Sequence, residues 1–224
     1  MKSTATARQR LAREFLLDAS YRTRVKFCGL KTQGDVAAAN HVKPDLCGFI
    51  TDYPASRRSL SCSEVRTLAA RVDAGIFTVS VTVNAPVADV GAAAEDGMVD
   101  LIQLHGDEGN DYIDGLRALT KAGIIQAFRI DSPADVDRAR ASAADMVLLD
   151  AGRGEGRTFN WNLISGFDRP FILAGGLSPE NVGVAIEELH PWGIDVSTGI
   201  ETDGSKDEAK MAAIMSAVRG ARSK

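Results

Sequence analysis

The chain has 224 residues, of which 45% are hydrophobic and 25% charged, and its formal net charge is −4, which suits one well-buried domain. The mild acidity argues against a nucleic-acid partner, and no apolar run approaches the roughly 20 residues that span a bilayer, so we expect no membrane contact. Three cysteines cannot all pair, so we expect reduced thiols, and because no metal-ligand spacing occurs we expect no bound metal. No signal-peptide core follows the N-terminus, so we expect a cytoplasmic location.

The segment before the first strand-like run, residues 4–21, has the pattern of an extra amphipathic helix. Apolar residues recur there at helical spacing, namely at Leu11, Phe15, Leu16 and Ala19, and charged residues lie on the other side. We expect residues 1–23 to form a helical extension packed on the domain of residues 24–224, with a structural or oligomeric role. The sequence leaves monomer and homodimer open.

Eight short apolar runs follow, separated by amphipathic segments. The predicted strands are 25–28, 46–50, 77–83, 101–104, 124–130, 146–150, 171–174 and 194–197. The predicted helices are 33–41, 63–71, 86–97, 110–122, 133–142, 179–189 and 206–219, with Pro86, Pro133 and Pro179 in first turns, where proline is tolerated. This alternation predicts a (β/α)8 TIM barrel, although a doubly wound open sheet gives the same pattern. The crossover 151–170 has room for only a short helix, which suggests a functional loop.

In such a barrel the reactive groups lie at the carboxyl ends of the strands. Cys28 ends the first run beside Gly29. Its thiol could act as nucleophile or general base, and nearby positive charge would lower its pKa. The alternative is that Cys28 is simply a small buried side chain. Asp150 ends the sixth run, where partial desolvation would raise its pKa and suit it to general acid catalysis; a helix cap or a salt bridge is the alternative.

Two further strand ends carry polar candidates. Arg57 and Arg58 follow the second strand and could hold a substrate carboxylate in a two-pronged bond, or simply be solvated. His105 follows the fourth strand and could contact substrate or cap the next helix. With three histidines in the whole chain, a Ser-His-Asp arrangement has little support.

The last two strands each run into a glycine-containing turn, at Gly175 and Gly176 and at Thr198 and Gly199. Glycine lets backbone N–H groups come close to an anion, and the positive end of a following helix favours phosphate. Two such turns at the last two strands of a barrel are typical of a phosphate clamp. The sequence therefore predicts a small phosphorylated substrate.

Taken in order, the strand-end motifs resemble the phosphoribosylanthranilate isomerase family of tryptophan biosynthesis. The matching segments are 26–29, 56–58, 79–84, 103–106, 148–150, 158–161, 175–182 and 195–201. The likeness covers about residues 24–220. No single motif is decisive, but the ordered set is specific.

The resemblance implies a (β/α)8 barrel and an Amadori rearrangement of N-(5-phosphoribosyl)anthranilate to 1-(2-carboxyphenylamino)-1-deoxyribulose 5-phosphate, with no metal, nucleotide or redox cofactor. On the matching positions it implies that Asp150 is the general acid that opens the sugar ring and that Cys28 is the general base at C2. It implies that Arg58 binds the anthranilate carboxylate. The other substrate-binding residues that it implies are His105, Asp195, Gly175, Gly176, Thr198 and Gly199.

The chain departs from the family pattern in three places, namely at Thr51 and Asp52, at Thr82, and within 152–160 at Arg153, Glu155 and Asn160. Three other functions stay open. An indoleglycerol-phosphate synthase would need a catalytic lysine, for which Lys26 is the candidate. A metal-dependent sugar-phosphate epimerase would need a cluster of histidines and carboxylates, and a non-catalytic phosphate-binding barrel would need neither acid nor base.

Overall fold

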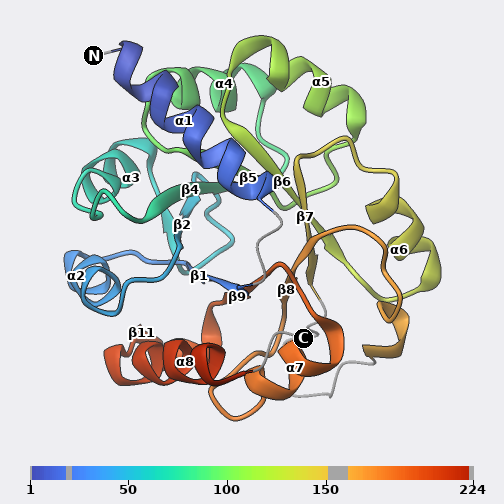
Figure 1. Cartoon of the computed structure of the whole chain (residues 1–224). Coiled ribbons are helices and arrows are strands. Elements are labelled where there is room, and N and C mark those ends of the chain that lie inside the picture. The colour runs from blue at the N-terminus through green and yellow to red at the C-terminus, as the bar shows by residue number, and fades with distance from the viewer. Residues whose placement is uncertain (1, 19–21, 151–160, 222–224) are drawn as a thin grey trace.

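The computed structural model describes residues 2–18, 22–150 and 161–221. Its barrel strands are β1 (Arg24–Cys28), β2 (Leu46–Thr51), β4 (Phe77–Thr82), β5 (Leu101–Leu104), β6 (Gly123–Arg129), β7 (Met146–Asp150), β8 (Phe171–Ala174) and β9 (Gly193–Val196). They are parallel and run around the barrel in this order (Figure 1). Because β1 pairs with both β2 and β9, the sheet is closed, and the open doubly wound alternative is excluded.

An outer layer of helices covers the barrel (Figure 1). These are α2 (Gln33–Val42), α3 (Cys62–Ala69), α4 (Val87–Glu95), α5 (Asn110–Leu119), α6 (Pro133–Arg140), α7 (Val182–Leu189) and α8 (Glu208–Gly220), with the 3₁₀ helices η1 (Trp161–Leu163) and η2 (Thr198–Ile200). Three short strands lie in loops, namely β3 (Ser59–Leu60), β10 (Glu201–Thr202) and β11 (Ser205–Lys206). The predicted (β/α)8 barrel is confirmed. Within the described part of the chain, no helix is long and apolar enough to cross a membrane.

Proline and aspartate fix several helix starts. Pro133 is the first residue of α6, as predicted, whereas Pro86 is the residue just before α4. The last helix, α8, starts two residues later than predicted, because the Asp207 carboxylate accepts hydrogen bonds from the first backbone N–H groups of that helix. Lys206 therefore belongs to the hairpin before α8, and its ammonium group turns toward the end of β9.

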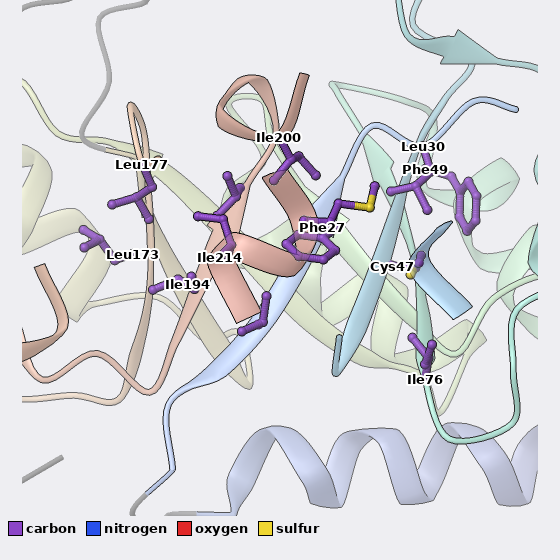
Figure 2. Packing of buried hydrophobic residues seen from close by; sticks show 14 of the residues in the cluster. Phe27, Leu30, Cys47, Phe49, Ile76, Leu173, Leu177, Ile194, Ile200 and Ile214 are labelled. Atoms are coloured by element: carbon purple, nitrogen blue, oxygen red, sulfur yellow. The ribbon is translucent and has the colours of Figure 1, made fainter. Parts of the chain in front are cut away.

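The largest hydrophobic core lies between the outside of the barrel and the helices (Figure 2). Alternate strand residues point into it, among them Phe27 of β1, Phe49 of β2 and Ile194 of β9, which are fully buried. Ile214 of α8 packs into the same cluster. Helices thus bury the outer face of the sheet, while the barrel interior buries the other, which is why the strands are apolar throughout.

The remaining strand residues point into the barrel. Apolar side chains fill most of this interior, including Leu46, Leu101 and Leu148. Buried polar side chains also point inward, among them Lys26, Gln103 and Asp195. The interior is therefore a packed floor beneath the carboxyl ends of the strands, where the predicted reactive groups lie.

The N-terminal extension forms α1 (Lys2–Leu17), which lies across the end of the barrel where the strands begin (blue in Figure 1). Leu16 is buried there, and the ring of Phe15 packs on that of Phe77 with centroids 5.2 Å apart. Arg8 Nε donates to Asp100 Oδ1, just before β5, at 2.7 Å. The extension thus covers the end opposite the predicted reactive groups.

Candidate active site

The turns after β8 and β9 lie against each other at the carboxyl end of the barrel. Gly175 and Gly176 have φ angles of 94° and 63°, a region that glycine reaches without strain. A Cβ on Gly199 would lie 1.9 Å from the carbonyl oxygen of Leu177, so only glycine lets the two turns approach so closely. The structure therefore brings the two halves of the predicted clamp together, with Thr198 beginning η2.

The helix after β8 begins later than predicted, at Val182 instead of Pro179. Asn181 causes the delay, because its Oδ1 accepts from the Ser178 N–H at 2.8 Å and its Nδ2 donates to the Gly176 carbonyl at 2.9 Å. These bonds close a turn where the first helical turn was expected. The glycine turn itself, followed by this second turn, therefore borders the mouth on the β8 side.

Cys28 ends β1 and lies inside the barrel beside Gly48 of β2. A Cβ on Gly48 would lie 3.1 Å from Cys28 Sγ and 2.9 Å from Lys26 Nζ, so glycine leaves room for both side chains. Lys26 Nζ donates to Asp195 Oδ1 at 2.9 Å in a buried ion pair. The predicted base therefore lies next to an ion pair that joins β1 to β9.

These surroundings raise the pKa of the Cys28 thiol instead of lowering it. Burial is the main cause and the Asp195 carboxylate adds to it, while Lys26 and Lys206 act in the opposite direction. Burial, the largest single influence, disfavours charge on Lys26, but Asp195 and Cys28 together outweigh it, so the pKa of Lys26 is raised and its ammonium stays charged. Positive charge from Lys26 and Lys206 is present, as the sequence analysis considered, but burial and then Asp195 outweigh it.

Asp150 ends β7, and its side chain is 28% exposed at the barrel mouth. Its Oδ2 lies 3.7 Å from Nε2 of His105, which follows β5. Gln103 holds the imidazole from below, with its Nε2 2.9 Å from His105 Nδ1. With the amide as donor, the ring proton is on Nε2, facing Asp150. Gly109, not His105, caps the next helix, so of the two predicted roles only substrate contact stays open.

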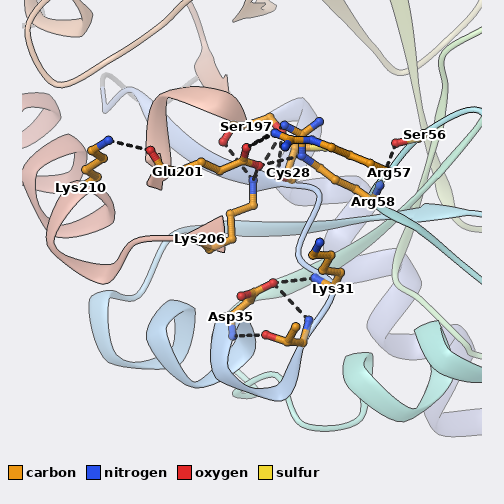
Figure 3. A network of polar contacts seen from close by, with 11 residues as sticks. Cys28, Lys31, Asp35, Ser56, Arg57, Arg58, Ser197, Glu201, Lys206 and Lys210 are labelled. Atoms are coloured by element: carbon orange, nitrogen blue, oxygen red, sulfur yellow. Dashed lines mark hydrogen bonds and ion pairs between the residues drawn. The ribbon is translucent and has the colours of Figure 1, made fainter. Parts of the chain in front are cut away.

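Arg58 is held over the mouth by Glu201 (Figure 3). Its Nε and Nη2 donate to the two carboxylate oxygens of Glu201 at 2.7 and 2.9 Å, and Arg57 Nη2 donates to the same carboxylate at 2.6 Å. Lys206 Nζ donates to Glu201 Oε1 and to the Ser197 carbonyl, both at 2.9 Å. Glu201 therefore links the arginine loop after β2 to the turn after β9.

The network fixes the charges of its members. Burial would raise the pKa of Glu201, but hydrogen bonds from Arg58 and Lys206 outweigh it and lower the pKa to about 2. The bond to Glu201 is also the main reason that the pKa of Arg58 is raised. Arg58 is only 15% exposed, against 57% for Arg57, so Arg58 is not simply solvated. Glu201 takes the Nε–Nη2 edge of Arg58, which leaves the Nη1–Nη2 edge for a second carboxylate.

Sequence reasoning missed part of this site. Lys206 lies in a two-strand hairpin that no periodicity indicated, and Gln103 was noted only as part of a motif. Glu201 was likewise only the last residue of a motif. The segment 151–160, with the departures at 153, 155 and 160 and most of the motif at 158–161, lies outside the described residues.

The closed (β/α)8 barrel carries a cysteine, a carboxylate, a partly buried arginine and two packed glycine turns around one mouth. This is the architecture of a barrel enzyme for a small phosphorylated substrate. The model of the N-(5'-phosphoribosyl)anthranilate (PRA) isomerase family matches residues 25–217. The chain belongs to this family, and the resemblance found in its motifs is confirmed.

Individual relatives agree with this assignment. The N-(5'-phosphoribosyl)anthranilate isomerase of Thermoanaerobacter sp. (strain X514) is 37% identical over 206 residues, which are 89% of this chain and 99% of the relative. The crystal structure of TrpF from Jonesia denitrificans is 36% identical with a TM-score of 0.78, covering 89% of this chain and 98% of that one. A phosphoribosyl anthranilate isomerase solved with reduced 1-(o-carboxyphenylamino)-1-deoxyribulose 5-phosphate is 30% identical with a TM-score of 0.77, covering 88% and 99%.

Proposed function

We propose that this chain converts N-(5-phosphoribosyl)anthranilate into 1-(2-carboxyphenylamino)-1-deoxyribulose 5-phosphate, a step of tryptophan biosynthesis, by general acid–base catalysis at the barrel mouth. The observation that carries the proposal is the placement of Cys28, Asp150 and Arg58 at one end of the barrel, on β1, β7 and the loop after β2. The family match supports the same reaction. The relative solved with the reduced carboxyphenylamino sugar phosphate supports the same substrate class.

In the first step, Asp150 in its protonated form donates a proton to the furanose ring oxygen. The bond between C1 and that oxygen breaks, and the lone pair of the anthranilate nitrogen forms an iminium ion at C1. His105, whose Nε2 lies 3.7 Å from Asp150 Oδ2, would contact the sugar beside the acid. The Asp150 side chain is 28% exposed, so a sugar bound at the mouth can reach it.

In the second step, the Cys28 thiolate removes the proton from C2. The C–H electron pair forms the C1=C2 bond of an enolamine, which tautomerises to the ketone. Burial raises the pKa of Cys28, so its thiolate is a strong base once formed. The positive iminium ion beside it would favour the thiolate at the moment when it is needed.

The two anionic ends of the substrate would bind at different strand ends of the mouth. The free Nη1–Nη2 edge of Arg58 would take the anthranilate carboxylate. Backbone N–H groups of the two glycine turns would hold the phosphate, at Gly175, Gly176, Thr198 and Gly199. Asp195, bonded to Lys26, is the remaining proposed substrate-binding residue.

Replacing Asp150 by asparagine tests the acid. We expect Asp150→Asn to lower kcat by a factor on the order of 10² or more, because an amide cannot deliver the proton. Affinity for a phosphate ligand such as ribose 5-phosphate should stay within about twofold, because the turns are untouched. Asp168→Asn, which changes an exposed carboxylate, is the matched control. Near-normal turnover of Asp150→Asn would remove Asp150 from the mechanism.

Arg58 and Arg57 form a natural pair for testing carboxylate binding. We expect Arg58→Ala mainly to raise KM, and Arg57→Ala to change it little, because Arg57 is largely solvated and bonded through one nitrogen. Steady-state kinetics with both variants measures this. A larger KM effect from Arg57→Ala would assign the carboxylate to Arg57.

We further propose that the enzyme works in the cytoplasm with its cysteines reduced. The three cysteines are unpaired in the structure. Monomer and homodimer both remain compatible with the proposal, and one relative, from Thermotoga maritima, is described as dimeric. Light scattering on the purified chain distinguishes the two states.

A further inference from the structure

A cavity of about 290 Å³ lies outside the barrel, between the sheet and helix α4, next to the start of α3. It is separate from the mouth, because its strand residues are those that point away from the barrel interior. Small side chains leave this space open, and those that line it include Thr51, Ser80, Thr82, Val90, Ala93 and Ala94. A cavity with an apolar body and a few polar groups is the usual form of a small-molecule site.

A buried hydroxyl without a partner lies at this cavity. Thr51 Oγ1 and Ser80 Oγ bond each other at 2.7 Å. Thr82 is 4% exposed, and its Oγ1 has no hydrogen-bond partner among residues 2–18, 22–150 and 161–221. A buried polar group that lacks a partner is uncommon and costly, and a bound molecule would satisfy it.

The outer rim of the cavity is acidic. Asp52 and Asp89 line it and are exposed. Cys62 Sγ donates to Asp52 Oδ2 at 2.9 Å, and burial together with Asp52 raises the pKa of this thiol to about 11, so the thiol stays neutral at pH 7. An acidic rim favours a cation and disfavours a carboxylate.

Three polar residues of the lining, Thr51, Asp52 and Thr82, carry the polar contacts of this cavity. Asp52 directly follows Thr51, and the pairing of β2 with β4 places Thr82 beside them, so the fold brings all three to one cavity. We propose that this cavity binds a small organic amine, protonated at neutral pH, with a single-ring apolar body and a second hydrogen-bonding group. The ammonium lies at Asp52, the ring lies against Ala93 and Ala94, and the second polar group reaches the Thr82 hydroxyl. This site does not depend on the proposed isomerase activity.

Tyramine has these three features and serves as the probe. Two-dimensional amide NMR of the full chain should show saturable shifts around the cavity, with a Kd on the order of 1 mM or tighter. Phenethylamine, which lacks the hydroxyl, should bind about threefold or more weakly, and 4-hydroxyphenylacetate, an acid of similar shape, about tenfold or more weakly.

Variants assign the binding to the cavity. Ala93→Leu fills the space and should abolish the shifts, whereas Ala92→Leu, an exposed neighbour on the same helix, should not. Asp52→Asn should weaken tyramine about tenfold, and the isosteric Thr82→Val should remove the preference for tyramine over phenethylamine without disturbing the fold. No saturable shift, binding unchanged in Ala93→Leu, or equal binding of the acid would each overturn the proposal.

Discussion

Replacing Glu201 by glutamine tests the network that holds Arg58. The Glu201 side chain is 6% exposed and accepts hydrogen bonds from Arg57, Arg58 and Lys206 at 2.6 to 2.9 Å. Its pKa is about 2, against an ordinary value of 4.5. That difference corresponds to about 3 kcal/mol of preference for the charged carboxylate in the folded chain. Glutamine keeps the shape but not the charge, so we expect the free energy of unfolding at pH 7 to fall by about 3 kcal/mol.

The pH dependence gives the effect a signature. Because the pKa of Glu201 is lower in the folded than in the unfolded chain, its stabilising contribution is complete above about pH 4.5 and is lost as the pH falls toward 2. The stabilities of the wild type and Glu201→Gln should therefore converge in that window. Urea denaturation at pH 7, 4.5 and 3 measures this. Glu208→Gln is the matched control, since Glu208 is half exposed and pairs with the exposed His41.

The same variant has a kinetic consequence. Without the Glu201 carboxylate, Arg58 loses the partner that fixes its orientation, so KM should rise more than kcat falls.

Equal stability of the wild type and Glu201→Gln at pH 7, or a difference that persists undiminished at pH 3, would refute the reasoning that Glu201 contributes a net stabilising charge.

Two further predictions concern packing. Leu16→Ala should lower the free energy of unfolding by about 2 to 4 kcal/mol in urea denaturation, because Leu16 is 1% exposed under the barrel, whereas Leu17→Ala, at a side chain that is 60% exposed, should have little effect. Gly199→Ala should weaken phosphate binding at least about tenfold in a titration with ribose 5-phosphate, because its Cβ would meet the Leu177 carbonyl oxygen and push the two turns apart. Gly183→Ala is the control, since a Cβ there meets no atom within 4 Å. Unchanged phosphate affinity in Gly199→Ala would contradict the clamp.

Much of the fold could be predicted from the sequence because the strands are buried on both faces. The runs 101–104, 146–150 and 171–174 match β5, β7 and β8 to the residue. The helical period of the N-terminal segment predicted α1 but not its position, because the packing of Phe15 on Phe77 and Trp192 joins residues that are distant in the chain.

The site could be predicted in part. Cys28 and Asp150 followed from the rule that reactive groups lie at strand ends, and both lie there. The direction of the pKa shift of Cys28 could not follow, because it depends first on how deeply the barrel buries the thiol and then on Asp195, which β9 brings next to Lys26. The role of Lys206 depends on a hairpin whose strands are two residues each, which is too short for a periodic pattern.

The most direct test of the central claim is the loss of anthranilate-type fluorescence when freshly made phosphoribosylanthranilate meets the purified protein. We expect rapid loss with the wild type and almost none with Cys28→Ala, while ribose 5-phosphate still binds the variant. That result would establish the isomerase and its base together. No loss with wild-type protein that binds ribose 5-phosphate would contradict the account and indicate a phosphate-binding barrel without this activity.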